Sequence, residues 1–106
     1  MAGTGVYGLR LRVRPEPDLL ELVPRYLARR EADVEALEEA VTLQDHATVH
    51  RIGHSMKGSG GGYGFQGITD IGLRLEDAGR EADLAAARLA IEDLGDYLRN
   101  VEILHD

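Results

Sequence analysis

Hydrophobic residues recur at helical spacing along most of the chain from Asp18 onward, which predicts a series of amphipathic helices. Asp18 is a candidate cap for the first helix. Pro24 lacks an amide proton, so we expect it to kink this helix or to separate a short first turn. Asp45 is a candidate cap for the second helix. The apolar stripe of the first helix is predicted to be Tyr26, Leu27, Val34, Leu37 and Val41.

Two further helices follow from the same spacing. The third is expected to begin at Gly67 or Thr69, and Asp83 is a candidate cap for the fourth. Their predicted inward positions are Ile68, Ile71, Leu75 and Ala78, then Leu84, Leu89, Ile91, Leu94, Leu98 and Val101. Short links between amphipathic helices make neighbours antiparallel. Residues 18–106 are therefore predicted to be all-α, an antiparallel up-down four-helix bundle.

Residues 1–17 have a different pattern. From Leu9 to Arg14, apolar residues alternate with arginines, and this period of two is typical of a strand. No second strand is evident elsewhere in the sequence. We therefore predict an extended N-terminal arm or tail over residues 1–17, which Pro15 and Pro17 separate from the bundle.

The composition fits one soluble domain. A chain of 106 residues with 43% hydrophobic residues can build a single core. No apolar run approaches the length of a membrane span and no secretory signal is evident, so we expect a cytoplasmic protein. The absence of cysteine excludes disulfides and thiolate metal sites. The net charge of −7 argues against general nucleic-acid binding, which depends on neutralising phosphates.

His54 is predicted to face solvent. Each residue of an α-helix advances by about 100°, which places His50, Lys57, Gly58 and Gly61 within roughly 60° of His54. The opposite side consists of apolar or small residues: Val49, Ile52, Met56, Ser59, Gly60 and Tyr63. This pattern argues against a histidine that is buried in the core.

Glycines are unusually dense after His54. Each costs about 1 kcal/mol relative to alanine inside a helix, so propensity predicts a loop from Gly60 onward. Small residues can be useful there in two ways. Inward glycines let a neighbouring helix approach closely, and outward glycines leave room for a partner to reach the ring.

The run HSMKGSGGGYGF, residues 54–65, resembles the signature of histidine phosphotransfer (HPt) domains. Leu75-Glu76 stands where that family usually carries a Leu-Glu pair, and Asp45 stands where an acidic turn usually precedes the histidine helix. Gly60-Gly61-Gly62 departs from the family, which more often has alanine, serine or asparagine. The signature positions fall on His54, Lys57, Gly58, Ser59 and Gly64.

The resemblance implies a phosphocarrier in a multistep two-component phosphorelay, in which His54 accepts and donates a phosphoryl group between receiver-domain aspartates. It implies that Lys57 stabilises the phosphoryl group, that Gly58 and Gly61 leave clearance for docking, and that Gly64 serves helix packing. The expected partners are response-regulator receiver domains, such as those of a hybrid histidine kinase. Any Mg²⁺ would belong to the receiver. We expect no cofactor or metal of its own, and no ATP-dependent kinase activity, for this chain.

Two alternatives remain open, a metal-binding module and a non-catalytic helical adaptor. His46, His50 and His54 are spaced so that adjacent pairs could chelate Zn²⁺ or Ni²⁺. A metal site also needs a third fixed ligand and outer support, so a solvated face is the preferred interpretation of His46 and His50. Residues 62–67 match G-x-G-x-x-G, but a helix rather than a strand precedes them, which argues against a dinucleotide site.

The charged runs are interpreted as solvent-facing helix sides. Residues 29–39 supply such a side for the first helix. Glu76, Asp77, Arg80 and Glu81 supply it for the third.

Overall fold

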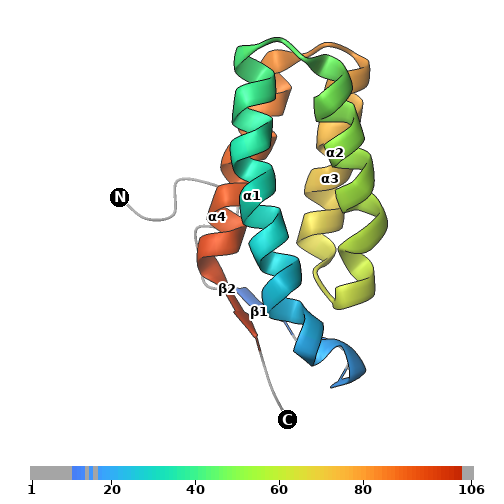
Figure 1. Ribbon diagram of the computed structural model, residues 1–106, viewed down its shortest axis with the longest axis vertical. Coiled ribbons are helices and arrows are strands. Elements are labelled where there is room, and N and C mark those ends of the chain that lie inside the picture. Colours follow the sequence, from blue (N-terminus) through green and yellow to red (C-terminus); the bar gives the residue numbers. More distant parts are fainter. Residues whose placement is uncertain (1–10, 14, 16, 104–106) are drawn as a thin grey trace.

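The computed structural model describes residues 11–13, 15 and 17–103. A bundle of four helices lies along the long axis of the molecule, and successive helices run in opposite directions (Figure 1). The predicted all-α four-helix bundle is thus confirmed. Its helices are α1 (Val23–Thr42), α2 (His46–Ser59), α3 (Gln66–Arg80) and α4 (Leu84–Asn100).

Two aspartates cap helices as their sequence positions predict. The Asp45 carboxylate accepts hydrogen bonds from the Thr48 amide at 3.1 Å and the Thr48 hydroxyl at 2.6 Å. These bonds lower the pKa of Asp45. The Asp83 carboxylate accepts a bond from the Ala86 amide at 3.0 Å. Each cap satisfies a backbone donor that a helix start leaves without a partner.

The starts of α1 and α3 differ in detail from their predictions. A 3₁₀ turn, Pro17–Leu22, precedes α1, and Pro24 lies in the first turn of α1. This is the separate first turn that Pro24 was expected to produce, because proline is tolerated only at a helix start. Helix α3 begins at Gln66, slightly before the predicted start.

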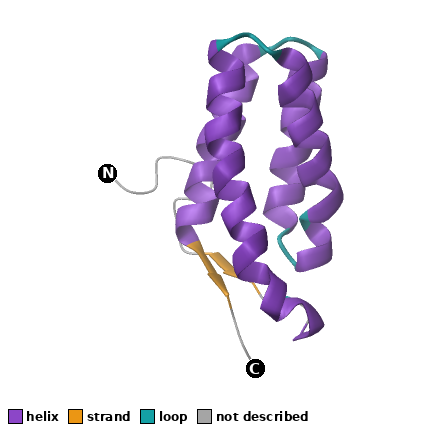
Figure 2. Ribbon diagram, viewed as in Figure 1, coloured by secondary structure: helices purple, strands orange, loops and turns teal. Residues whose placement is uncertain are grey.

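Two short strands correct the prediction of an unpaired N-terminal arm. Strand β1 (Leu11–Val13) pairs in parallel with β2 (Val101–Ile103), with Leu11 opposite Val101. Figure 2 shows both strands beyond the C-terminal end of α4. The sequence pattern missed β2 because Val101 continues the helical spacing of the last helix. Residues 1–10, 14 and 16 of the predicted arm lie outside the described residues.

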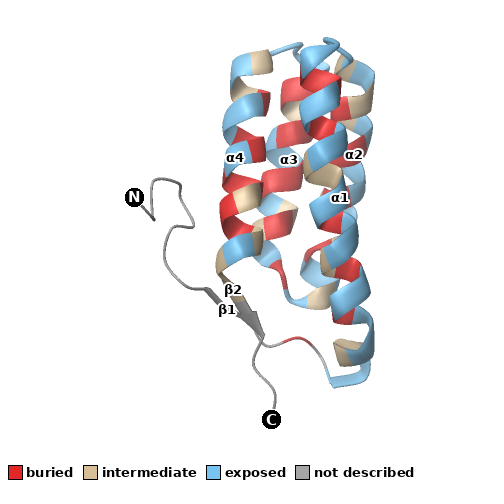
Figure 3. Ribbon diagram, turned by 60° about the vertical axis from the view of Figure 1, so that its left-hand side comes forward, coloured by how far each residue is buried: buried red, intermediate tan, exposed pale blue. Residues whose placement is uncertain are grey.

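The core runs along the middle of the bundle, where buried faces of the helices meet (Figure 3). The predicted inward residues of α3 are all buried. Leu89 of α4 was predicted inward but is 60% exposed. It precedes the buried Leu94 by five residues, which turns it about 140° away from the core. The largest fully buried side chains are Phe65, Leu37, Met56, Ile68, Ile71, Leu75, Leu94 and Val49.

Helices α2 and α3 pack closest because glycines line the seam between them. A Cβ atom added at Gly53 would lie 2.4 Å from the amide nitrogen of Glu76. One added at Gly72 would lie 2.4 Å from the amide nitrogen of Lys57, and one added at Gly79 would lie 2.5 Å from that of His50. No side chain fits at these distances. The glycines therefore let the helix that carries His54 lie directly against Glu76.

Candidate functional site

His54 lies on the exposed side of α2, as predicted. Its side chain is 68% exposed, whereas Ile52 and Met56 on the other side of the same helix are buried. The two sides follow from the helical repeat alone. A large partner can therefore reach the imidazole ring from solvent.

A buried carboxylate holds the inner edge of this ring. Oε2 of Glu76 lies 2.6 Å from Nδ1 of His54, and Oε1 of Glu76 accepts a hydrogen bond from Nζ of Lys57 at 2.7 Å. The Glu76 side chain is only 6% exposed, and that of Lys57 is 36% exposed. Two residues of α2 and one of α3 thus form a single connected cluster.

The prediction that Glu76 lies on the solvent-facing side of the third helix is wrong. Gly72 and Gly79 bracket it one turn away in each direction, and they let α2 cover this part of α3. The resemblance to HPt domains had marked Leu75-Glu76 as a family feature without giving it a role. The signal that could have found the role is an acidic residue placed between two small ones on a helix face.

The contact with Glu76 fixes the tautomer of the neutral His54 ring. Hydrogen bonds from Lys57 and His54 lower the pKa of Glu76 from 4.5 to about 2. At neutral pH Glu76 is therefore ionised, and an ionised carboxylate only accepts hydrogen bonds. Nδ1 of His54 must then carry the proton in the contact with Glu76. In the neutral ring the lone pair available for reaction consequently lies on the outward nitrogen, Nε2.

The other two histidines of α2, His46 and His50, are less exposed than His54. Nδ1 of His50 lies 3.1 Å from the backbone oxygen of Glu76, so His50 is half-buried rather than fully solvated as predicted. Its ring stacks on that of His54 with centroids 6.5 Å apart. His46 is also half-buried. Within the described part of the chain, no group of three or more His, Cys, Asp or Glu residues is arranged to hold a metal ion.

Gly58, one turn after His54, borders open space, and Gly61 lies just beyond the C-terminal end of α2. A Cβ atom at Gly58 would meet nothing within 4 Å. Gly61 is also exposed, and its amide donates a hydrogen bond to Oγ1 of Thr69 at 2.7 Å. A Cβ at Gly61 would lie 3.4 Å from Oε1 of Gln66. The surface is therefore low at Gly58, where a side chain would enter open space, whereas a side chain at Gly61 would contact Gln66 and Thr69.

Gly64 does not pack one helix against another, which corrects its predicted role. It is exposed, it has φ = 89°, and its amide donates to the carbonyl of Gly61 at 3.0 Å. Glycine adopts positive φ without steric cost, so Gly64 closes the turn after a short 3₁₀ helix, Gly61–Tyr63. The glycines at the contact between α2 and α3 are instead Gly53, Gly60, Gly72 and Gly79.

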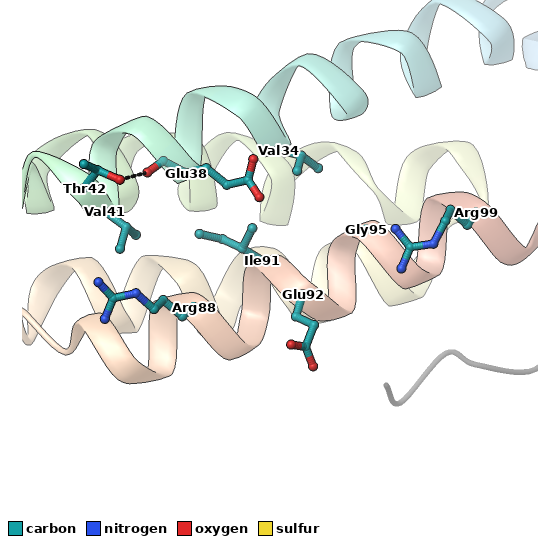
Figure 4. A pocket seen from close by; sticks show the side chains of 9 residues that line it. All are labelled: Val34, Glu38, Val41, Thr42, Arg88, Ile91, Glu92, Gly95 and Arg99. Carbon is teal, nitrogen blue, oxygen red and sulfur yellow. Dashed lines mark hydrogen bonds between the residues drawn. The ribbon is translucent and has the colours of Figure 1, made fainter. Parts of the chain in front are cut away.

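A second feature, a hollow of about 490 Å³, lies between α1 and α4 (Figure 4). Val41 and Ile91 form part of its floor, and Glu38 and Arg88 face it from the two helices. None of its lining residues belongs to α2 or α3. It is therefore separate from the surface around His54.

In the described part of the chain, no helix is both long and apolar enough to cross a membrane.

Comparison with known protein families identifies the family of this chain. Comparison with curated proteins and with solved structures gave no match. The sequence model of the Hpt domain matches residues 21–103, a range that includes all four helices and the cluster around His54. The chain therefore belongs to the Hpt domain family, whose members carry phosphoryl groups on histidine in phosphorelays and interact with response-regulator receiver domains.

Proposed function

We propose that His54 is the phosphoacceptor of this Hpt domain and that the chain carries a phosphoryl group between the aspartates of two receiver domains. The observation that carries this proposal is the pairing of His54 with Glu76. The ring is 68% exposed and its inner nitrogen is held by a carboxylate, while its outer nitrogen has no hydrogen-bond partner among the described residues.

The transfer follows from this geometry. The lone pair of Nε2 attacks the phosphorus of an aspartyl phosphate, so an N–P bond forms as the P–O bond to the aspartate breaks. The electron pair of that bond leaves with the aspartate carboxylate. Nδ1 of His54 keeps its proton, so the phosphorylated ring carries positive charge next to the Glu76 carboxylate. Glu76 thus stabilises charge that develops during transfer. Donation to a second receiver is the reverse sequence.

Lys57 is proposed to stabilise the phosphoryl oxygens. Its ammonium has three N–H donors, and one of them is directed to Oε1 of Glu76 at 2.7 Å. The remaining donors can meet a phosphoryl group on the neighbouring ring. Because Lys57 supplies neither the nucleophile nor the leaving group, its contribution is to the rate and not to the existence of transfer.

A receiver domain is proposed to dock over Gly58 and Gly61, where the surface beside the ring is low. Any Mg²⁺ would be held by the receiver. The carboxylate next to His54 is Glu76, which is already bonded to His54 and Lys57. A hybrid histidine kinase is a suitable source of the donor receiver. The chain itself would act as a carrier with no ATP-dependent kinase activity.

The test is transfer from a receiver domain charged with acetyl phosphate and Mg²⁺. We expect the chain to gain one phosphoryl group that is labile in acid and stable in base, and mass spectrometry should map it to His54. His54→Gln should keep its fold and gain no phosphate. Phosphate on His46 or His50, or transfer to the folded His54→Gln variant, would contradict the proposal.

A further inference from the structure

Side chains of α1 form polar contacts with the C-terminal end of α2, the helix that carries His54. The Tyr26 hydroxyl lies 2.9 Å from Oγ of Ser59, and Nη1 of Arg30 donates to the same oxygen at 3.3 Å. The Arg30 guanidinium also lies 4.8 Å from the centre of the Tyr26 ring. Arg30 is 8% exposed, which corrects the prediction that the charged run of α1 faces solvent throughout.

Aromatic rings also connect α1 to the residues that follow α2. The rings of Tyr26 and Tyr63 stack with centroids 4.3 Å apart, and those of Tyr26 and Phe65 lie 5.8 Å apart. Ser59 precedes Gly60–Gly64 and Phe65 follows them. Helix α1 therefore contacts the glycine-rich segment at both of its ends. We call Tyr26, Arg30, Ser59 and Tyr63 the α1 clamp.

The chemistry of the clamp differs from that of ordinary core packing. Arg30 also pairs with Asp33 at 3.0 Å, and burial raises the pKa of Asp33. Burying charged groups costs desolvation energy, and apolar residues of similar volume often stabilise as well or better. The hydrogen bond from buried Arg30 to Ser59 instead fixes the position of α2 relative to α1.

The glycine-rich segment over residues 60–64 is conformationally flexible by composition. Glycine loses more conformational freedom on folding than any other residue, and Gly60–Gly62 and Gly64 lie between the two ends that α1 contacts. The seam with α3 holds α2 from the other side, at Gly53 and Gly72. The start of α3 also contacts this segment, since the Gly61 amide donates to Oγ1 of Thr69. The contacts from α1 add a second constraint, at Ser59 and Tyr63. The end of α2 includes the low surface beside His54.

We propose that Tyr26, Arg30 and Ser59 are positioning residues for transfer from receivers. The α1 clamp holds the glycine-rich end of α2 in the shape against which a receiver docks, while the reactivity of His54 depends on Glu76 and Lys57. This inference rests on the proposed phosphocarrier function and adds to it a part of α1 that does not touch the ring.

The experiment compares two phosphoryl donors on three single variants of the full chain. Phosphoramidate is small and reaches His54 without docking, whereas a receiver charged with acetyl phosphate must dock. Ser59→Ala and Tyr26→Phe each remove one hydroxyl, and Tyr26→Phe keeps the aromatic stack. Thr42→Val is the matched control, because it removes an α1 hydroxyl whose bond, to the Glu38 carbonyl at 3.0 Å, lies away from the clamp.

We expect phosphoramidate to modify all variants at the wild-type rate. Transfer from the receiver should fall about tenfold for Ser59→Ala and Tyr26→Phe and stay unchanged for Thr42→Val, since small misplacements at a reacting site are costly. Amide hydrogen exchange at residues 60–64 should quicken in the two clamp variants. In the same two variants, the receiver concentration that gives half-maximal transfer should be higher than for the wild type.

Three results would overturn the inference. Wild-type receiver transfer by both clamp variants would show that the α1 clamp does not shape the docking surface. An equal loss with both donors would place its effect on His54 rather than on docking. Failure of the wild-type chain with both donors would remove the phosphocarrier function itself, and this result is distinct from the other two.

Discussion

Gly53→Ala tests whether the close approach of α2 and α3 builds the site. The added Cβ would lie 2.4 Å from the Glu76 amide nitrogen, 2.7 Å from the Gly72 carbonyl oxygen and 2.8 Å from Cβ of Leu75. These atoms belong to the backbone or are bonded directly to it, so they cannot turn aside. The two helices would have to separate, and Glu76 would move away from His54.

The magnitude is a balance of two terms. Overpacking a well-packed site costs about 1–3 kcal/mol, and the backbone contacts here place Gly53 towards the upper end. Replacing glycine by alanine in a helix returns about 1 kcal/mol. The net loss is about 1–2 kcal/mol. In a domain of this size, each kcal/mol lowers Tm by about 4–8 °C.

Gly58→Ala is the matched control on the same helix. Its Cβ would meet nothing within 4 Å, so only the helix-propensity gain of up to about 1 kcal/mol remains. Thermal and urea unfolding followed by circular dichroism should show Gly53→Ala below the wild type and Gly58→Ala at or above it. Equal stability of Gly53→Ala and wild type would refute the close-packed seam, as would equal losses in both variants.

Three further predictions concern the site itself. Glu76→Gln removes a carboxylate whose pKa is about 2 in the folded chain against an ordinary 4.5. Because the pKa of Glu76 is lower in the folded chain, the ionised carboxylate stabilises the fold at pH values above the ordinary pKa of 4.5. This stabilisation disappears as the pH falls towards 2. The Tm advantage of wild type over Glu76→Gln should therefore shrink across this pH window, and a constant gap would be evidence against the cluster. Lys57→Ala should slow transfer from a charged receiver without abolishing it; unchanged kinetics over a range of salt concentrations would remove Lys57 from the mechanism. Gly58→Leu should keep the thermal stability of the wild type, yet it should sharply reduce receiver transfer because a side chain fills the docking surface. A stable Gly58→Leu variant with wild-type transfer would show that Gly58 does not border that surface.

Local sequence was sufficient for the features that depend on one helix. The exposure of His54 and the burial of Ile52 and Met56 follow from the helical repeat, and so do the caps at Asp45 and Asp83. The end of α2 at Ser59 follows from the low helix propensity of the glycines after it.

Features that join distant segments were not predictable in the same way. Glu76 reads as solvent-facing on its own helix, and only the approach of α2 over Gly72 and Gly79 buries it. Arg30 belongs to a charged run, yet it is buried and donates to a hydroxyl in another helix. Strand β2 continues a helical pattern and becomes a strand by pairing with β1. In each case the partner lies far away in the sequence.

The most direct test of the account is to locate the phosphoryl group on the His54 ring. Long-range ¹H–¹⁵N NMR of the ring, recorded on the chain after phosphorylation, distinguishes the two nitrogens. The hydrogen bond between Nδ1 and Glu76 predicts phosphate on Nε2 and a retained proton on Nδ1. Phosphate on Nδ1, or a His54 ring that stays unmodified while another residue carries the phosphate, would contradict it.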